Sequence, residues 1–394
     1  MRVALVHDWL EHYAGSERVF EQLLLMYPEA DLFAVVDFVP KEERGFLQGR
    51  PVKTTFIQRL PFARRYFRHF IGLMPLAIEQ LDMSGYDLII SSSHSVAKGV
   101  ITGPNQVHVS YVHSPMRYAW DLQAQYLREG NLERGLKGLY ARLLLHRLRG
   151  WDARTALGVD VFVANSNYIA DRVRKVYRRE AVTVPPPVAV NEFVPGYGLR
   201  EAYLVASRFV PYKRVELIVE AFAQMPKRHL IVVGSGPGLQ RVLNAARRCA
   251  NIEIRPPVPK AELVRLMQSA RAFVFAAEED FGITLVEAQA CGTPVITFGA
   301  GGARDIVIDD TEAATAPTGI LFRHQTAASV TEAVERFEAH QERFGAASCQ
   351  QNAARFSTMA FRASIERVVR NATAHHENRR AGARPGALQK PIAA

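Results

Sequence analysis

One stretch decides the fold class of this chain: Ala277-Glu278-Glu279-Asp280-Phe281-Gly282-Ile283-Thr284-Leu285-Val286-Glu287-Ala288-Gln289-Ala290-Cys291-Gly292-Thr293-Pro294-Val295-Ile296. A short apolar run, 272–275, precedes its charged residues, and another, 294–297, ends it. Runs that are apolar on both faces predict strands that are covered on both sides, as in parallel sheets. Gly282 and Gly292 bracket a segment of helical length between the two runs. The stretch therefore predicts one β-α-β unit of an α/β fold.

The same alternation of apolar runs and longer helical segments recurs along the chain in two sets. The first set comprises 3–6, 88–90, 107–112 and 159–163, and the second comprises 203–206, 229–233, 272–275 and 294–297. Because parallel strands are joined by crossover helices, two sets predict two parallel-sheet domains. Ligands of such sheets bind at the carboxyl ends of the strands, so two facing sheets are expected to form a cleft.

A proline run, Val184-Pro185-Pro186-Pro187-Val188, separates the two sets and fits neither a helix interior nor a central strand. An ordinary loop is the alternative to a linker here. We expect an N-terminal domain over 1–195, a C-terminal domain over 196–355 and a last helix over 356–370, with Ser357 as its N-cap. Residues 371–394 offer little that forms a buried face, which predicts a disordered tail.

Composition sets the broad class of the protein. The 394 residues are 48% hydrophobic and carry a formal net charge of +10, as in a globular protein whose surface favours anionic partners. Three cysteines without CxxC spacing argue against a disulfide scaffold and a structural zinc site. No secretory signal is visible, and no apolar run reaches the ~20 residues that span a bilayer. We expect a cytoplasmic protein.

Two glutamates of the deciding stretch are candidates for ligand binding. Glu279 is expected in the turn between strand and helix, with Glu287 about two helical turns away, so the two carboxylates can address different hydroxyl groups of one extended ligand. Backbone N–H groups near 281–284 are expected to face an anion at the helix start. The alternative is that both glutamates lie on a solvated helix face.

The context of these glutamates resembles a known family. Glu279-x7-Glu287, with Phe281-Gly282 and the following Ala-x-Ala-Cys-Gly-x-Pro-Val, is similar to the hallmark of the family 4 retaining glycosyltransferases. The resemblance implies the GT-B fold, which has two Rossmann-like domains facing across a cleft and a C-terminal helix that crosses back to the first domain. It further implies a hexosyltransferase that uses a nucleotide-diphosphate sugar, with the leaving phosphate oxygen assisting deprotonation of the acceptor.

The resemblance also implies roles for single residues of the second half. Glu279 would bind the transferred sugar, together with the backbone of Phe281, Gly282 and Ile283, and Glu287 would hold the ribose hydroxyls.

The diphosphate is expected to lie near two cations of the second half. Arg208 and Lys213, in Ser207-Arg208-Phe209-Val210-Pro211-Tyr212-Lys213, match the family's diphosphate-binding cations. Fixed cations would stabilise the charge that develops on the leaving diphosphate, so no divalent metal and no further cofactor is expected. Gly234 lies in a glycine turn that either approaches the nucleotide or is purely structural. Val258 lies in the expected base-recognition loop, whose sequence leaves guanine and uracil both open.

The first half contributes a second group of candidates. Gly15 lies in a loop that resembles the family's glycine-rich loop and allows a close backbone approach, although a structural turn is the alternative. His113 matches the family histidine near the transferred sugar, where it would act in catalysis; a structural histidine is the alternative. His12, Arg117 and Trp120 are expected on the acceptor side.

The segment 44–78 combines basic and aromatic residues, with no acidic residue between its ends. Such a stretch suits the surface of an anionic membrane, and a helix packed on the sheet with a basic rim is the alternative. The longer sequence motifs of the chain most resemble those of bacterial mannosyltransferases of surface-polysaccharide assembly. This resemblance implies GDP-mannose as donor and a polyprenyl-diphosphate-linked glycan as acceptor.

Three other functions remain as alternatives to the mannosyltransferase. The first is the same fold with a UDP-sugar donor, and the second is a nucleotide-sugar epimerase or phosphorylase-like enzyme. The third is a binding protein that uses the basic surface for nucleic acid or membrane. The acidic and basic residues of the donor motifs argue against the third, and no nucleic-acid partner is expected.

Overall fold

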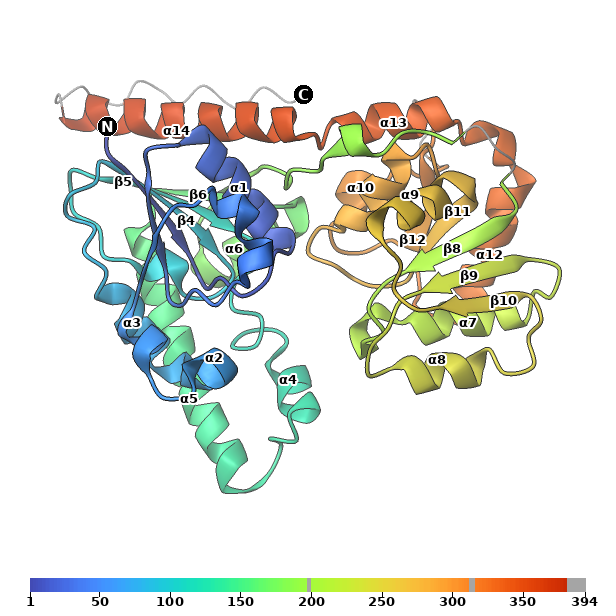
Figure 1. Cartoon of the computed structure of the whole chain (residues 1–394), viewed down its shortest axis with the longest axis horizontal. Helices are drawn as coiled ribbons and strands as arrows, with labels where there is room; N and C mark the ends of the chain where they lie inside the picture. Colours follow the sequence, from blue (N-terminus) through green and yellow to red (C-terminus); the bar gives the residue numbers. More distant parts are fainter. Residues whose placement is uncertain (197–199, 312–315, 381–394) are drawn as a thin grey trace. The chain divides into compact units, whose positions relative to one another are not determined.

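The computed structural model describes residues 1–196, 200–311 and 316–380, and it divides the chain into two compact units (Figure 1). Unit 1 comprises Met1–Val184 together with the chain from Arg362, and unit 2 comprises Pro185–Phe361. Each unit is built on one parallel sheet, as the two sets of apolar runs predict.

The sheet of unit 1 has seven parallel strands in the order β3-β2-β1-β4-β5-β6-β7. Its strands are β1 (Val3–His7), β2 (Asp31–Ala34), β3 (Val52–Thr54), β4 (Leu88–Ser93), β5 (Val107–Val112), β6 (Val161–Ala164) and β7 (Ala181–Thr183). The connecting helices are α1 (Gly15–Met26), α2 (Ala63–Tyr66), α3 (Met74–Glu79), α4 (Gln123–Glu129), α5 (Gly135–Thr155) and α6 (Asn167–Tyr177). All residues of β1, β4 and β5 are buried, so these central strands are covered on both faces.

The sheet of unit 2 has six parallel strands in the order β10-β9-β8-β11-β12-β13. Its strands are β8 (Ala202–Ala206), β9 (His229–Val233), β10 (Ile252–Arg255), β11 (Ala270–Phe275), β12 (Val295–Phe298) and β13 (Gly319–Phe322). Its helices are α7 (Val215–Ala223), α8 (Leu239–Ala245), α9 (Lys260–Ser269), α10 (Ile283–Ala290), α11 (Ala303–Ile306), α12 (Ala327–Ala339) and α13 (Ala346–Ala354), and α14 (Thr358–Arg380) follows them.

Both sheets reverse their winding direction beside their first strand. In unit 1 the chain moves outward from β1 through β2 and β3 and then returns to add β4 on the other side; in unit 2 the same reversal separates β8 from β11. Loops diverge at such a point, which leaves room for a ligand at the carboxyl ends of the flanking strands. The candidate residues are therefore expected at these two positions.

The units divide between Val184 and Pro185, within the proline run, whereas the sequence analysis places the boundary at 195/196. The physical reason lies in the residues that follow the prolines. Val188 is completely buried and its N–H donates to the carbonyl of Phe356, while Phe193 lies in the core of unit 2. These side chains attach 188–193 to the second unit.

The last helix, α14, runs from Thr358 to Arg380, ten residues past the predicted end at 370. Ser357 caps its start, as predicted, because its Oγ accepts the N–H of Ala360 at 3.3 Å. Val369 and Ala372 are buried, so the helix still packs after position 370. Extending an existing helix costs little compared with starting one, and the polar residues that follow continue it. The predicted tail is thus wrong for 371–380, and 381–394 lie outside the described residues.

Five of the strands in the described residues were not predicted: β2, β3, β7, β10 and β13. Two of them, β3 and β7, are three residues long and half exposed, so their sequences show neither a buried run nor a clear alternation. Within the described residues, no helix is long and apolar enough to cross a membrane.

Candidate functional site

The site residues of unit 1 lie where β1, β4 and β5 end. His7 is the last residue of β1, Ser92 lies near the end of β4, and His113 follows β5 directly. The sheet register sets His7 opposite Ser92, and the His113 N–H donates to the carbonyl of Ser93 at 2.8 Å. Residues that are far apart in the sequence thus meet at one edge of the sheet.

His113 is held at both its backbone and its ring. Its carbonyl accepts a hydrogen bond from Asn165 Nδ2 at 3.0 Å, and its Nε2 lies 2.8 Å from Ser92 Oγ. Burial, with His94 and His7 nearby, lowers the pKa of His113 to about 3. The ring is therefore neutral at physiological pH, with one nitrogen that donates and one that accepts.

A chain of polar contacts links His113 to a carboxylate through two further side chains. Glu17 Oε1 lies 3.4 Å from His7 Nε2, and His7 Nδ1 lies 3.1 Å from Ser92 Oγ. Burial would raise the pKa of Glu17, but hydrogen bonds from His7 and Ser16, and attraction to His7, lower it to about 2. Glu17 is thus an ionised group at physiological pH that can only accept.

This chain of contacts allows one arrangement of protons that reaches His113. An ionised Glu17 can only accept, so Nε2–H of His7 donates to it, and Nδ1 of His7 can accept from the Ser92 hydroxyl. The Ser92 oxygen can then accept from Nε2–H of His113. We infer that Nδ1 of His113 is left as the basic nitrogen, able to accept a hydrogen bond from a ligand hydroxyl.

Asp8 fixes the loop that follows β4. It is completely buried, and its carboxylate accepts backbone N–H groups from each of the four residues 94–97, at 2.5–2.9 Å. His94 Nδ1 lies 3.0 Å from the same carboxylate. Burial would raise the pKa of Asp8, but these contacts with His94 and the nearby His7 hold it well below its ordinary value. The loop therefore places His94 beside Trp9, with ring centroids 4.5 Å apart.

In unit 2, Lys213 and Glu279 form an ion pair near the carboxyl ends of β8 and β11. Lys213 ends a short 3₁₀ turn, Pro211–Lys213, and its Nζ lies 5.0 Å from the centre of the Phe275 ring. Glu279 is fixed through its backbone, because its carbonyl accepts the N–H of Gly302 at 2.8 Å. Both side chains keep part of their surface exposed, so the pair is reachable by a ligand.

A glycine turn after β9 packs against the loop that carries Arg208. Gly234 has φ of 153°, and a Cβ placed there would lie 1.9 Å from the Ser207 carbonyl oxygen. The Phe209 N–H donates to the Ser235 carbonyl at 2.7 Å, which ties the two loops together. Only glycine allows this approach. The Arg208 side chain is exposed at this junction, as a diphosphate-binding cation requires.

The helix α10 begins where the deciding stretch predicts. Gly282, with φ of 106°, is its N-cap, and Ile283 is its first residue. Phe281 is buried in the core of unit 2, which leaves only its backbone for a ligand. Glu287 is 8% exposed and lies on α10 among buried residues, so it is not part of a solvated helix face.

Comparison with known proteins agrees with this architecture. Residues 13–192 match the model of Glycosyltransferase Family 4, and residues 197–355 match that of Glycosyl transferases group 1. The chain belongs to the family 4 glycosyltransferases. The family named from the sequence is thereby confirmed.

Two curated relatives of this family 4 chain illustrate the range of the similarity. The D-inositol 3-phosphate glycosyltransferase of Geodermatophilus obscurus is 28% identical over 269 residues, which are 59% of this chain and 57% of the relative. A GDP-mannose-dependent alpha-(1-6)-phosphatidylinositol monomannoside mannosyltransferase of Mycolicibacterium smegmatis is 28% identical over 198 residues, 41% and 52% of the two chains. The matches span about half the length of these relatives.

Solved structures confirm the fold of the family 4 chain. HepE of Anabaena in complex with UDP aligns with a TM-score of 0.68 and 16% identity over 94% of this chain and 100% of the other. Sucrose-phosphate synthase of Thermosynechococcus elongatus aligns with a TM-score of 0.69 and 19% identity over 95% and 100%. The predicted GT-B class, with two parallel-sheet α/β domains, is correct.

Four predicted residues of this glycosyltransferase lie outside the contacts described above. Gly15 is exposed at the first position of α1, and His12 is exposed with its Nδ1 3.8 Å from Glu43. Arg117 is half-buried. The Trp120 indole N–H donates to Asp152 at 2.7 Å, so its one donor is used inside unit 1. Trp120 can offer an acceptor only the face of its ring.

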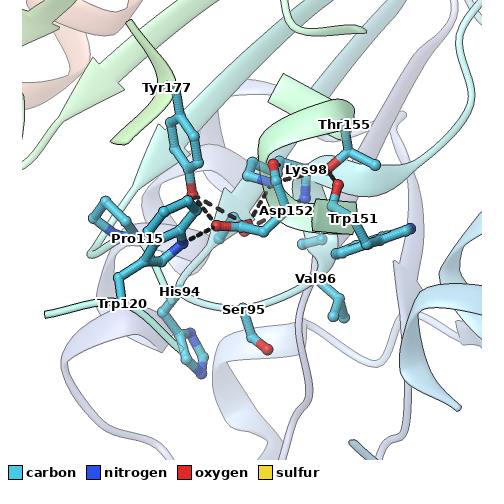
Figure 2. Close-up of polar contacts among 12 residues, drawn as sticks. His94, Ser95, Val96, Lys98, Pro115, Trp120, Trp151, Asp152, Thr155 and Tyr177 are labelled. Carbon is cyan, nitrogen blue, oxygen red and sulfur yellow. Dashed lines mark hydrogen bonds and ion pairs between the residues drawn. The ribbon is translucent and has the colours of Figure 1, made fainter. Parts of the chain in front are cut away.

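Trp120 belongs to a buried network around Asp152 of α5 (Figure 2). The Nζ of Lys98 lies 2.7 Å from Asp152 Oδ1 and donates to Thr155 Oγ1 at 2.9 Å. The Tyr177 hydroxyl donates to the same carboxylate at 3.0 Å. Both charges of the Lys98–Asp152 pair are almost completely buried, and each has hydrogen-bond partners, which a buried pair requires. The network attaches the C-terminal end of α5 to the core.

Val258 is the last of the predicted residues. It is partly buried against the core of unit 2, so its side chain is a packing residue. In unit 1, Ser166 caps α6 by accepting the N–H of Ile169 at 3.1 Å, and the neighbouring Asn165 supports His113. Among the described residues, no group of three or more His, Cys, Asp or Glu side chains is placed to hold a metal ion.

The sequence alone did not identify the residues that surround His113. His7, Asp8 and Glu17 lie inside or beside the loop that contains Gly15, and Ser92 and His94 lie at the end of β4 and directly after it. A signal for the last two exists: the apolar strand β4 ends in Ser91-Ser92-Ser93-His94-Ser95, a run of small polar residues at the carboxyl end of a buried strand.

Proposed function

We propose that this chain is a retaining hexosyltransferase that moves mannose from GDP-mannose to a polyprenyl-diphosphate-linked glycan, without a divalent metal. The observation that carries the proposal is the Lys213–Glu279 pair, which lies at the winding reversal of unit 2, where the chain matches the model of Glycosyl transferases group 1. A sugar diphosphate needs a cation at its phosphates and an acceptor for its hydroxyl groups, and this pair provides both.

Each residue then has one task in the reaction. Arg208 and Lys213 bind the diphosphate and stabilise the negative charge that it gains as its bond to the sugar breaks. Glu279 and the backbone at 281–283 orient the sugar, and Glu287 binds the ribose hydroxyls. The acceptor oxygen bonds to the sugar carbon on the face that the phosphate leaves, and its proton passes to the departing phosphate oxygen. His113, neutral and with Nδ1 free to accept, binds a hydroxyl group of the sugar.

The identity of the donor rests on the relatives. The Mycolicibacterium smegmatis relative is named GDP-mannose-dependent, which supports mannose. A UDP-sugar is the second candidate, since HepE of Anabaena was solved with UDP and with UDP-glucose. The side chain of Val258 is partly buried, so recognition of either base by this loop would use its backbone.

Association with an anionic membrane through 44–78 belongs to the same proposal. In unit 1 this segment buries Ile57, Phe67 and Met74, as the packed-helix alternative requires. It also leaves Phe62 and Leu76 more than half exposed, near the exposed Arg64 and Arg65. Such a combination provides apolar anchors with basic neighbours for a lipid-linked acceptor.

A donor panel tests the catalytic proposal. GDP-mannose, UDP-glucose, UDP-GlcNAc and UDP-galactose are compared by thermal stabilisation and by slow donor hydrolysis. GDP-mannose alone is expected to stabilise the protein and to be hydrolysed. Glu279→Gln should lower the rate about 100-fold, by analogy with the loss of one transition-state hydrogen bond. Glu278→Gln is the matched control, because Glu278 is exposed and adjacent in sequence.

Each other result of the panel changes the proposal in a defined way. Turnover of a UDP-sugar would retain the transferase and replace mannose. Equal losses in Glu279→Gln and Glu278→Gln would remove Glu279 from the site. No response to any donor would overturn the catalytic proposal and favour a binding protein.

A further inference from the structure

The two ends of α5 have opposite environments. Its C-terminal end is fixed in the core through Asp152 and Leu148, whereas its N-terminal half extends away from the strands of unit 1 toward α4 (Figure 1). In that half, four large apolar side chains are exposed: Leu136 by 86%, Leu139 by 56%, Tyr140 by 68% and Leu143 by 57%. A globular protein rarely leaves such a group in water.

The spacing of these side chains places them on one face. Positions 136, 139, 140 and 143 follow the i, i+3, i+4, i+7 pattern, so their side chains form a stripe along two turns of the helix. The opposite side of α5 packs on the unit: Leu148 is buried, and Leu144 lies so close to Gly72 that a Cβ there would be 3.0 Å from its Cδ1. The exposed stripe is therefore additional to the face that holds α5 in the fold.

Basic residues outnumber acidic ones around the stripe. Five basic residues lie on α5, namely Lys137, Arg142, Arg147, Arg149 and Arg154, and Arg134 precedes the helix. Arg154, at the far end of α5, pairs with Glu79, and the exposed Glu133 is adjacent to Arg134 in the sequence. The one acidic residue of the helix, Asp152, is buried and paired with Lys98. The N-terminal half of α5 thus combines exposed leucines with the exposed cations Lys137 and Arg142.

We propose that the N-terminal half of α5 docks on an anionic lipid leaflet, with the stripe facing the acyl layer and the basic residues facing the headgroups. An amphipathic helix with these two features binds at such an interface. A second copy of the chain fits less well, because it would set one basic helix against another. Nucleic acid would leave four apolar side chains without a partner.

This proposal adds a second, separate segment to the membrane contact proposed for 44–78, and it does not depend on the sugar or the base of the donor. The contact between Leu144 and Gly72 makes α5 a neighbour of that segment within unit 1. The two proposals are distinguishable because the apolar residues of α5 can be changed while 44–78 is left intact.

Vesicle sedimentation tests the docking of α5. The full chain is mixed with vesicles of equal parts phosphatidylglycerol and phosphatidylcholine, or of phosphatidylcholine alone. Leu139→Ser combined with Leu143→Ser should weaken binding to the anionic vesicles by about tenfold for each leucine. Lys137→Gln should weaken it about fivefold, and less at high salt. Phosphatidylcholine alone should bind the wild type much more weakly.

A matched control exists in unit 2. Leu239 and Leu243 have the same i, i+4 spacing on α8 and are exposed by 38% and 43%, so Leu239→Ser with Leu243→Ser makes the same chemical change on another helix. This control should bind vesicles as the wild type does. Circular dichroism and the thermal midpoint check that each variant is folded, and stabilisation by GDP-mannose reports the donor site independently.

Three results would overturn the docking of α5. The first is no binding of the wild type to anionic vesicles. The second is binding by the α5 variant equal to that of the wild type, in which case 44–78 alone carries the contact. The third is a dimer in lipid-free solution that the α5 variant converts to a monomer, which would make a second copy the partner. Loss of donor stabilisation without loss of vesicle binding would count against the catalytic proposal only.

Discussion

The two units position their candidate site residues in different ways. Unit 1 uses buried side chains: Asp8, His7 and Ser92 are completely buried, and they come from two strands that are more than 80 positions apart in sequence. Unit 2 uses the backbone of tight turns, with Gly234 and Gly282 at positive φ and the Lys213–Glu279 pair open to a ligand.

Because of this difference, the two units should tolerate different kinds of amino-acid substitution. A buried polar network loses stability when a charge or a hydrogen bond is removed, because the remaining groups are left desolvated and unpaired. A turn built on glycine fails when a side chain is added, because the backbone has no room for it. Polar substitutions should therefore damage unit 1 most, and added methyl groups should damage unit 2 most.

The largest effect is expected from Asp8→Asn in unit 1. The substitution removes the buried charge and sets an amide NH2 against backbone N–H groups of 94–97, which should lower the free energy of unfolding by about 3–5 kcal/mol. All three tryptophans, Trp9, Trp120 and Trp151, lie in unit 1, so their fluorescence during urea unfolding reports this unit.

Asp171→Asn is the matched control for this measurement. Asp171 is exposed and pairs with Arg174 on the surface of α6, so its loss should cost less than about 1 kcal/mol. If Asp8→Asn were as well tolerated as the control, the stability of unit 1 would not depend on this buried carboxylate.

The next effect concerns Gly234→Ala in unit 2. The added Cβ would lie 1.9 Å from the Ser207 carbonyl oxygen at an unfavourable φ, so the loop that carries Arg208 must move. We expect a loss of about 1–3 kcal/mol in calorimetric unfolding and loss of donor stabilisation. Gly345→Ala, whose Cβ would be 3.6 Å from the nearest side-chain atom, should leave both unchanged. Full donor stabilisation in Gly234→Ala would show that the glycine turn is purely structural.

The sequence predicted the grouping of the candidate residues in unit 2 better than in unit 1, for the same physical reason. Glu279, Gly282 and Glu287 fall within one β-α-β unit, so local spacing suffices to place them. In unit 1 only the register of β1 against β4 joins His7 to Ser92, and sequence spacing contains no information on that pairing. His113 was found through its motif, whereas its partners required the sheet.

Packing explains the errors at the domain boundary and the last helix as well. The proline run predicted a break, but whether 188–193 belong before or after it depends on the burial of Val188 and Phe193 in unit 2. The end of α14 was placed too early because helix propagation, rather than burial, extends it to Arg380. Neither property can be read from the composition of the segment alone.

A smaller effect is the response of unit 1 to acid. Burial lowers the pKa of His108 to about 4, and burial with its neighbours His94 and His7 lowers that of His113 to about 3, both from 6.5. The unfolded chain takes up these protons below pH 6.5 while the folded chain does not. The two histidines therefore cost no stability above pH 6.5, and the free energy of unfolding decreases as the pH falls from 6.5 toward 4.

Tryptophan fluorescence in urea measures this acid dependence. The free energy of unfolding should fall by about 1.4 kcal/mol per pH unit for each of the two histidines between pH 6 and about 4. His108→Gln should remove about half of that slope and leave the His113 part. A slope that His108→Gln does not change would show that His108 is protonated in the folded protein.

The smallest effect sharpens the comparison at His113 itself. If Glu17 sets the tautomer through His7 and Ser92, then Glu17→Gln, whose amide can both donate and accept, weakens that preference without emptying the site. Nitrogen NMR of His113 should show the proton on Nε2 in the wild type and a mixture in the variant, while donor hydrolysis falls by about tenfold. Glu21→Gln is the control and should change neither reading, because the half-buried Glu21 on the same helix accepts from the Tyr13 hydroxyl and not from a histidine. Because the unfolding free energy measures packing and the NMR shifts measure the proton, a variant that loses stability but keeps its Nε2 proton would assign Glu17 a structural role. A changed tautomer at unchanged stability would instead show that unit 1, unlike unit 2, orients its candidate residues through a chain of side-chain hydrogen bonds.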